Sequence, residues 1–392
     1  IEKLEKHPAK ENLFVAVVDD GKGSAVVVTA APNLSAGDIV PWGRPGAVLA
    51  DGSVLGTRDF EGVESVGMLL SAAELGIPEA ADEFGILRLP AETAPGEDVK
   101  HLLGLDDAIL DLSVTPNRGD LLSMLGVARE VYALFPEATW KMDLTAFPAN
   151  AMNAEWPVDF KGITLKDDGC PLYCLGLITG LKSVPSPLRT RILLTLLGMR
   201  PISAMVDATN FAMLMLGQPT HAFDADRLPS PEITVRSAAD GEETRTLDGK
   251  NHRLEPGDML ITSGGLAVGI AGVMGGENSE ILESTRTVFL ESANFDAIRV
   301  SRTSRRLGII SEAAFRYARI VDTRIAQTAL KYISSLLEEW GAAEGGYAIL
   351  SASTKLPEEK SVTLTKKKLK KILLTEDMKE ASAILSRLGL VE

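Results

Sequence analysis

Hydrophobic residues in the first quarter of the chain occur as short runs that turn residues interrupt. The stretch 13–42 alternates β-branched runs with Asp-Gly, Gly-Lys-Gly and Pro-Asn sequences, and residues 45–56 repeat this pattern. Several short strands at such spacing are typical of a small barrel. We therefore expect residues 1–107 to form a barrel-like domain, with one or two helical turns at 71–77.

The pattern changes at residue 108. It predicts a strand over 108–120 that ends in a Thr-Pro-Asn turn, and Asp120 stands where a cap would precede the apolar helix 121–135. A stretch rich in Pro, Ala and Asn, 147–157, follows and is typical of a linker. The segment 108–146 is therefore expected to form a small unit of its own.

Beyond the linker, helical and alternating periodicities follow one another, which predicts an α+β region. Two helices are expected first, at 186–199 and 206–216, and residues 217–228 are expected to form a loop. The remaining predicted elements are a strand-rich stretch 232–276, a strand at 287–295, an arginine-bearing helix, a helix near 312–340, a closing segment 345–350, and a tail 356–392 with a strand-like 361–365 and two helices. The fold class is thus multidomain α+β.

Composition places the chain among ordinary globular proteins. Of 392 residues, 45% are hydrophobic and 24% charged, which argues against disorder. The apolar run 266–274 is about half the length that crosses a bilayer. The two cysteines, Cys170 and Cys174, are too few for a disulfide framework or a cysteine zinc site, so a reduced, cytoplasmic setting is expected. The chain opens on Ile1 without a visible leader, which predicts a processed or trimmed protein.

Charge is unevenly distributed. The net charge of −14 disfavours attraction of nucleic acid to the whole surface. Residues 295–320, however, hold six arginines against two acidic residues, and 365–371 is rich in lysine. Such segments either form a solvated helix face, which charge alone favours, or hold a polyanion.

The glycine-rich stretch 264–276 invites a nucleotide-binding interpretation, which its pattern does not support. It has no phosphate-loop lysine, and it leads from Glu277 and Asn278 into another turn, where a phosphate-binding loop would open a helix. Its glycines, among them Gly272 and Gly275, either permit positive φ in a turn or let the backbone approach a small ligand. Both alternatives stay open.

His221 is one of four histidines and follows a Gly-Gln-Pro turn. Asp224 and Asp226 stand close by, but no second histidine lies at helical spacing, so a metal site is disfavoured. A neutral imidazole can handle a proton or position a water near physiological pH. The alternative is a loop histidine that only satisfies backbone groups.

Glu291 stands within an apolar segment that is expected to be a strand. Such a carboxylate either faces solvent at the strand end or, if buried, needs a strong hydrogen-bond donor, for which a ligand hydroxyl would serve. The sequence shows no Ser or Cys nucleophile motif. Any chemistry is therefore expected to be attack by water on a bound substrate.

Taken together, the motifs resemble one known family, the β chain of bacterial phenylalanyl-tRNA synthetase. The resemblance covers nearly the whole sequence and rests on six motifs in matching order and spacing: TPNRGDLLSMLGVAREV, MRPISAMVDATNF, GQPTHAFD, GVMGGENSEI, VFLESANF and GIISEAAFRYARIVD.

The resemblance implies a domain layout. Residues 1–107 are similar to the family's tRNA-binding barrel of the oligonucleotide-binding (OB-fold) type, and 108–146 to the second half of its small N-terminal (B1-like) domain. Residues 150–350 are similar to the editing (B3/B4-like) module, and 356–392 to the start of a winged-helix-like (B5-like) domain. The chain is therefore expected to be truncated, without the family's catalytic-like and anticodon-binding domains.

The resemblance also implies partners. Aminoacylation is expected to belong to the α chain of an α2β2 assembly, with ATP and Mg²⁺ serving the whole synthetase. The present chain is expected to bind no cofactor or metal itself and to bind tRNA(Phe).

In the family, the editing pocket hydrolyses tyrosine wrongly esterified to tRNA(Phe). By position, His221 and Asn210 match polar residues near the scissile ester, and Glu291 matches the carboxylate that recognises the tyrosine hydroxyl. The other implied positions are Gly272 and Gly275 at the pocket floor and Ser311 and Ala313 on the far wall. If the local cluster of positive charge holds the tRNA, the expected contacts are Arg299, Arg302, Arg305 and Arg306.

The sequence departs from the family near that wall. Ser311 stands where the family has Thr, Ala314 where Ser is usual, Ala318 where Glu is usual, and Ile320 where Gly is usual. These changes put the strength of editing in question but leave the fold unaffected. The alternatives are a tRNA-binding module without activity and a fragment that only supports other domains.

Overall fold

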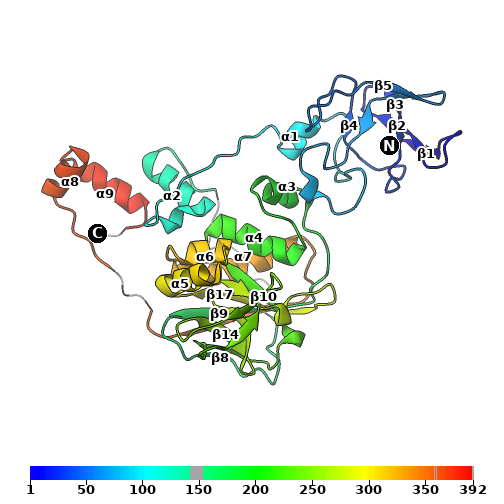
Figure 1. Cartoon of the computed structure of the whole chain (residues 1–392). Coiled ribbons are helices and arrows are strands. Elements are labelled where there is room, and N and C mark those ends of the chain that lie inside the picture. Colours follow the sequence, from blue (N-terminus) through cyan, green and yellow to red (C-terminus); the bar gives the residue numbers. More distant parts are fainter. Residues whose placement is uncertain (142–152, 357, 359, 391–392) are drawn as a thin grey trace. The chain divides into compact units, whose positions relative to one another are not determined.

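The computed structural model describes residues 1–141, 153–356, 358 and 360–390, and the chain divides into two compact units. The first comprises Ile1–Asp111 with Pro185–Ser203, and the second comprises Leu112–Val184 with Ala204–Glu392. Helices and strands occur in both units (Figure 1). The linker expected at 147–157 falls partly outside the described residues.

The first unit is built from short antiparallel strands, as the broken hydrophobic runs predict. A three-stranded sheet has the order β1-β2-β3, and two pairs, β4 with β7 and β5 with β6, accompany it. Ala16, Val18, Val27 and Leu69 lie in its core. Closure of these strands into a barrel stays a prediction. The bounds are β1 Lys3–Lys6, β2 Phe14–Asp19, β3 Ser24–Thr29, β4 Trp42–Gly43, β5 Thr57–Phe60, β6 Val63–Val66 and β7 Met68–Leu69.

A second cluster in this unit joins segments that are far apart in sequence. Helix α3 (Leu188–Leu196) packs against the 3₁₀ turn η1 (Pro78–Ala80), and Ile192 is buried with Ile77 and Leu103 of the helix α1 (Val99–Leu103). The helix expected at 186–199 is present. Residues 72–76 form turns, in which the Leu75 N–H donates to the Ser71 carbonyl as in a single helical turn, and η1 follows.

The second unit contains a four-stranded antiparallel sheet of order β10-β17-β9-β18. Its strands β9 and β17 are buried along nearly their whole length, because both of their faces are covered. The helices α4 and α7 pack on one face, where Cys174, Leu290 and Ile333 are buried. The bounds are β9 Leu172–Thr179, β10 Thr220–Asp224, β17 Thr287–Asn294, β18 Tyr347–Ser353, α4 Ala204–Leu216 and α7 Ala326–Glu339.

The other face of that sheet packs on a five-stranded sheet of order β16-β15-β14-β11-β8. Tyr173 and Phe289 of the first sheet share one core with Leu260 and Val268 of the second. The order of layers is therefore helices, sheet, sheet (Figure 1). The bounds are β8 Ile163–Leu165, β11 Ile233–Ser237, β14 Met259–Ser263, β15 Leu266–Ile270 and β16 Met274–Gly275, with a separate hairpin of β12 Glu243–Arg245 and β13 Asn251–Arg253.

Further helices border these layers. The arginine-bearing helix is α5 (Ala297–Leu307), and the helix expected near 312–340 is divided into α6 (Glu312–Tyr317), η5 (Thr323–Ile325) and α7. The two helices predicted in the tail are α8 (Lys366–Leu373) and α9 (Met378–Arg387). Helix α2 (Met124–Leu134) contacts α9.

Four expectations from the sequence are wrong. Residues 108–120 and 361–365 contain no strand, because no neighbouring strand pairs with them. The apolar helix is capped by Ser123, whose Oγ accepts a hydrogen bond from the Gly126 N–H, and Asp120 instead lies in the preceding 3₁₀ turn. The expected loop 217–228 contains strand β10, because its residues 220–224 pair along β17. None of the described helices is long and apolar enough to cross a membrane.

Candidate functional site

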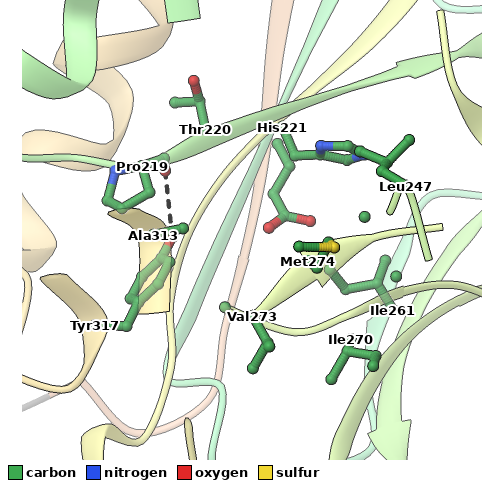
Figure 2. Close-up of a pocket in the computed structure, with 14 residues that line it drawn as sticks. Pro219, Thr220, His221, Leu247, Ile261, Ile270, Val273, Met274, Ala313 and Tyr317 are labelled. Atoms are coloured by element: carbon green, nitrogen blue, oxygen red, sulfur yellow. Dashed lines mark hydrogen bonds between the residues drawn. The ribbon is translucent and has the colours of Figure 1, made fainter. Parts of the chain in front are cut away.

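A cavity of about 200 Å³ opens between the two sheets and helix α6. Its side chains come from strands β10 and β17 of one sheet, β14 to β16 of the other, and α6 (Figure 2). The lining residues are Pro219, Thr220, His221, Leu247, Ile261, Gly269, Ile270, Gly272, Val273, Met274, Gly275, Glu291, Ala313 and Tyr317. Five of the residues implied by the resemblance thus lie at one cavity: His221, Gly272, Gly275, Glu291 and Ala313.

Glu291 is the acidic group of this cavity. It lies in the middle of β17, opposite His221 of β10 and Leu175 of β9, and only 5% of it is exposed. Burial raises the pKa of its carboxyl to about 7, and a hydrogen bond from the Tyr173 hydroxyl opposes that rise. The Tyr173 hydroxyl is 2.7 Å from Glu291 Oε2. The carboxyl therefore titrates near neutral pH, with the ionised form stabilised by a phenol.

His221 borders the cavity from the neighbouring strand. Its ring packs edge-on against Phe223, with ring centroids 4.6 Å apart. Its Nε2 atom is buried and has no hydrogen-bond partner among the described residues. Burial lowers the pKa of the imidazole to about 4, so the ring is neutral at pH 7. A buried, unpaired ring nitrogen at a cavity wall can bind a water or a substrate group.

The two glycines of the floor are required for different reasons. Gly272 has φ +70°, and a Cβ there would come within 3.0 Å of Phe295 and Val300. Gly275 has an ordinary φ, but a Cβ on it would enter the His221 ring. The absence of a side chain at Gly275 therefore lets the imidazole lie directly on the β16 backbone.

The far wall is held by α6. Ser311 caps this helix by accepting from the Ala314 N–H, and its hydroxyl donates to the Val273 carbonyl at 2.7 Å. Ser311 does not line the cavity itself. Its two hydrogen bonds hold the start of α6, which carries the lining residues Ala313 and Tyr317. Ala313 and Tyr317 project from α6 into the cavity (Figure 2).

Sequence reasoning missed two tyrosines that hold this site. The Tyr317 hydroxyl lies 3.0 Å from the Ala293 carbonyl, 3.2 Å from the Pro219 carbonyl and 3.3 Å from Gln218 Nε2. Tyr173 binds Glu291 from within an apolar strand. A tyrosine in a fully buried apolar run requires a polar partner, and this is the signal that could have revealed Tyr173.

Asn210 is placed apart from the other implied residues. It lies on α4, is partly exposed, and is not among the residues that line the cavity. Helix α4 covers the sheet that carries Glu291, but the cavity is bordered by α6. A role for Asn210 at the ester therefore has no support from this arrangement and stays a prediction.

The four arginines of α5 line a separate groove of about 1030 Å³ with residues 255–258 and Ala318. Arg299 is engaged, with Nη2 2.8 Å from Asp167 Oδ2 and Nε 3.0 Å from the Gly257 carbonyl. Arg306 likewise pairs with Asp258.

The other two arginines of this group point to solvent. Among the residues that the structure describes, the Arg305 side chain hydrogen-bonds only to the Ser301 hydroxyl of its own helix. Arg302 makes no ion pair or side-chain hydrogen bond within the part of the chain that the structure describes. Arg302 and Arg305 are therefore the members available to a ligand.

Among the described residues, no group of three or more His, Cys, Asp or Glu side chains is arranged to hold a metal ion. Cys170 and Cys174 are both free and buried.

Comparisons with known proteins give two domain matches. Residues 169–342 match the family described as "B3/4 domain", and residues 1–98 match the family described as "Putative tRNA binding domain". A phenylalanine–tRNA ligase beta subunit from Dehalococcoides mccartyi is 39% identical over 99% of this chain. The chain is a homologue of the phenylalanine–tRNA ligase beta subunit.

Other beta subunits give similar matches. Identity is 43% over 85% of this chain for Anaeromyxobacter dehalogenans and 36% over 97% for Thermotoga maritima. The chain spans about half the length of these relatives, from 41% for the Anaeromyxobacter subunit to 48% for the other two. It therefore corresponds to the part of a phenylalanine–tRNA ligase beta subunit that contains the tRNA-binding and B3/4 domains.

Proposed function

We propose that this chain binds tRNA(Phe) and that its cavity hydrolyses tyrosine wrongly esterified to that tRNA. The observation that carries the proposal is that His221, with its buried Nε2, and the buried Glu291 lie at one small cavity, one residue on each of two neighbouring strands. The α chain would carry out aminoacylation with ATP and Mg²⁺, so the present chain would serve a cytoplasmic α2β2 synthetase by proofreading.

Glu291 supplies the selectivity in this proposal. Tyrosine differs from phenylalanine by one hydroxyl, and its phenol would donate to the carboxylate of Glu291. Phenylalanine in the same place would leave that buried group without its second partner. A site built to hydrogen-bond a substrate hydroxyl rejects the analogue without it by roughly 10⁴-fold or more. The apolar walls, including Ile261, Ile270 and Val273, would surround the ring.

His221 is the group that would position the attacking water. Its neutral ring has an unpaired, buried Nε2 at the cavity wall, where it can hydrogen-bond a water molecule. The water would attack the ester carbonyl, and the bond from that carbon to the ribose oxygen would break, releasing tyrosine and tRNA. The ester is already reactive, so orientation and stabilisation of the developing oxyanion suffice. Backbone N–H groups near Gly272 and Gly275 would provide that stabilisation.

The tRNA would contact the groove beside α5. Arg302 and Arg305 are exposed and uncompensated, whereas Arg299 and Arg306 are bound to Asp167 and Asp258. Helix α6 separates this groove from the cavity, since Tyr317 lines the cavity and Ala318 the groove. Phosphates held at Arg302 and Arg305 would therefore lie beside the site where the esterified end of the tRNA reacts.

Deacylation assays would test the proposal. The chain is incubated with tyrosyl-tRNA(Phe) and with phenylalanyl-tRNA(Phe), beside the variants Glu291→Ala and His221→Ala. We expect release of tyrosine alone, loss of selectivity in the Glu291 variant and loss of rate in the His221 variant. Glu280→Ala and His101→Ala, at exposed positions outside the cavity, serve as matched controls with unchanged rates.

A different result would favour the alternative. If the folded chain binds tRNA but releases tyrosine no faster than the uncatalysed reaction, it is a tRNA-binding module without editing activity. Ser311, Ala318 and Ile320, which differ from the family pattern, would then be the first positions to restore. If the chain binds no tRNA at any salt concentration, both functions are excluded.

A further inference from the structure

Tyr173 is fully buried on strand β9 and reaches the proposed site only through Glu291. Its hydroxyl is 2.7 Å from Glu291 Oε2. In the strand register Glu291 faces Leu175 and Ala293 faces Tyr173, so the phenol approaches the carboxylate diagonally across the sheet. Tyr173 does not line the cavity, whereas Glu291 does. Any effect of Tyr173 on a ligand must therefore pass through the carboxylate.

This contact occupies one oxygen of Glu291 and leaves the other open to the cavity. Oε2 accepts from Tyr173, and Oε1 has no hydrogen-bond partner among the residues that the structure describes. An ionised carboxylate accepts several hydrogen bonds, so Oε1 can accept a second one from a donor group of a molecule bound in the cavity. Packing alone would be satisfied by phenylalanine at position 173, because the ring is surrounded by Leu175, Phe289 and other apolar side chains. The hydroxyl is therefore the part of Tyr173 that needs an explanation.

The groups that face Glu291 carry no compensating positive charge. From β10 comes His221, from β9 Tyr173, from the preceding turn Cys170 and from α6 Tyr317. Burial lowers the pKa of His221 and raises the pKa of Cys170 and of both tyrosines, so all four are neutral at pH 7. The hydrogen bond from Tyr173 is thus the one described contact that favours the ionised carboxylate.

We propose that Tyr173 is a specificity-determining positioning residue, which holds one oxygen of Glu291 so that the other meets the hydroxyl of the tyrosyl group. This inference rests on the proposed editing function and deepens it. The phenol acts as a fixed donor because it stays protonated. It sets the rotamer of the Glu291 side chain and keeps the carboxylate ionised, so that the carboxylate can accept a hydrogen bond from the substrate hydroxyl.

The variant Tyr173→Phe tests this role with little change in volume. We expect kcat/KM for tyrosyl-tRNA(Phe) to fall about tenfold or more, with the larger part of the loss in KM. The slow reaction with phenylalanyl-tRNA(Phe) should not change, because phenylalanine makes no use of the carboxylate. The pH at which selectivity for tyrosine appears should move upward, because the pKa of Glu291 rises when its donor is removed.

Tyr347→Phe is the matched control. Tyr347 lies on β18 of the same sheet, and its buried hydroxyl has no hydrogen-bond partner among the described residues. Its removal should leave rate, selectivity and pH profile unchanged. The proposal would be overturned if Tyr173→Phe lost rate equally on tyrosyl-tRNA(Phe) and phenylalanyl-tRNA(Phe) and kept the pH profile of the parent. Such a result would show that Tyr173 has a merely structural role.

A second measurement separates failure of this inference from failure of the proposed function. Carbon NMR of ¹³C-labelled glutamate follows the titration of Glu291 in the free chain, assigned with Glu291→Gln. We expect the midpoint to rise in Tyr173→Phe and to stay in place in Tyr347→Phe. An unmoved midpoint would overturn the inference even in an active editing chain. A raised midpoint in a chain that releases no tyrosine would instead reject the editing function, and with it the specificity role.

Discussion

His221 and Glu291 face each other directly across the antiparallel pair β10–β17. Residues opposite each other in a ladder point to the same side of the sheet, so both side chains reach the same cavity. Burial moves their pKa values in opposite directions, that of Glu291 up to about 7 and that of His221 down to about 4. The strand pairing thus places a neutral base and a titratable acid side by side at the cavity.

Gly275→Ala should disable this pair without unfolding the chain. A methyl group on Gly275 would enter the His221 ring, which must then move. Because small displacements of a reacting group are costly, we expect the rate of tyrosyl-tRNA(Phe) deacylation to fall roughly 100-fold.

Gly269→Ala is the control for that change. Gly269 pairs with Gly275 and lines the same cavity, but its added Cβ would meet only ordinary contacts, at 3.6 Å from Gly275 Cα and Met274 O. It should lose less activity than Gly275→Ala, because the His221 ring keeps its position. Equal rates for the two variants would show that the position of the His221 ring does not matter for the reaction.

Glu291→Gln should change how stability depends on pH. The folded state holds the Glu291 proton up to a pKa of about 7, against an ordinary value of 4.5. The stabilising contribution of this proton is complete below pH 4.5 and is lost as pH rises to about 7. Glutamine removes that loss, so the stability of the variant relative to the parent should increase by roughly 3 kcal/mol between pH 4.5 and 8.

Urea unfolding of both proteins across this pH range measures the difference. His221→Gln should give the reverse trend, since a lowered histidine pKa contributes stability above about pH 6.5 that is lost as pH falls toward 4. A difference between parent and Glu291→Gln that does not vary with pH would contradict the burial of an ionisable carboxyl.

Arg299→Ala should act on stability, and Arg302→Ala on tRNA binding. Arg299 is the partner of Asp167, a carboxylate whose side chain is only 3% exposed. Burial by itself raises the pKa of Asp167, but hydrogen bonds from Arg299, Ser237 and the Gly169 N–H outweigh it and hold the pKa at about 2. Removing Arg299 leaves a buried charge unpaired, which costs about 3 kcal/mol.

Arg302 has no such partner, so Arg302→Ala should change stability by less than about 0.5 kcal/mol. Its affinity for tRNA should fall, and the slope of log affinity against log salt should become shallower by about 1. Urea unfolding and filter binding at several salt concentrations distinguish the two variants. If both behave alike in both assays, the division of the arginines into paired and available members is wrong.

Ile320→Gly should stabilise the chain. Ile320 has φ +68°, a left-handed conformation that is costly for a β-branched residue, and its side chain is 76% exposed. Glycine relieves this strain, for an expected gain of about 1 kcal/mol in the free energy of unfolding. Ile310→Gly is the control, because Ile310 is 96% exposed at a residue without positive φ. A variant Ile320→Gly that is less stable than the parent would refute the strain.

The sequence by itself determined the elements whose pattern is local. The apolar periodicity of α7, the alternating runs of β2 and β3, and the apolar strand that carries Glu291 are all visible in the order of residues, because side-chain direction repeats along a helix or strand. The sequence also showed that Ile320 stands where the family usually has glycine. The conformational strain of this replacement became visible only in the structure, as a positive φ at Ile320.

Only the tertiary structure decided which of these residues meet. His221 was expected in a loop, and pairing with β17 makes its segment a strand opposite Glu291. Tyr173 and Arg299 were equally hidden, because their partners, Glu291 and Asp167, lie more than a hundred residues away in sequence. Strand register and long-range packing set these contacts, and both depend on free energies summed over whole sheets, which a local pattern of hydrophobic and polar residues does not contain.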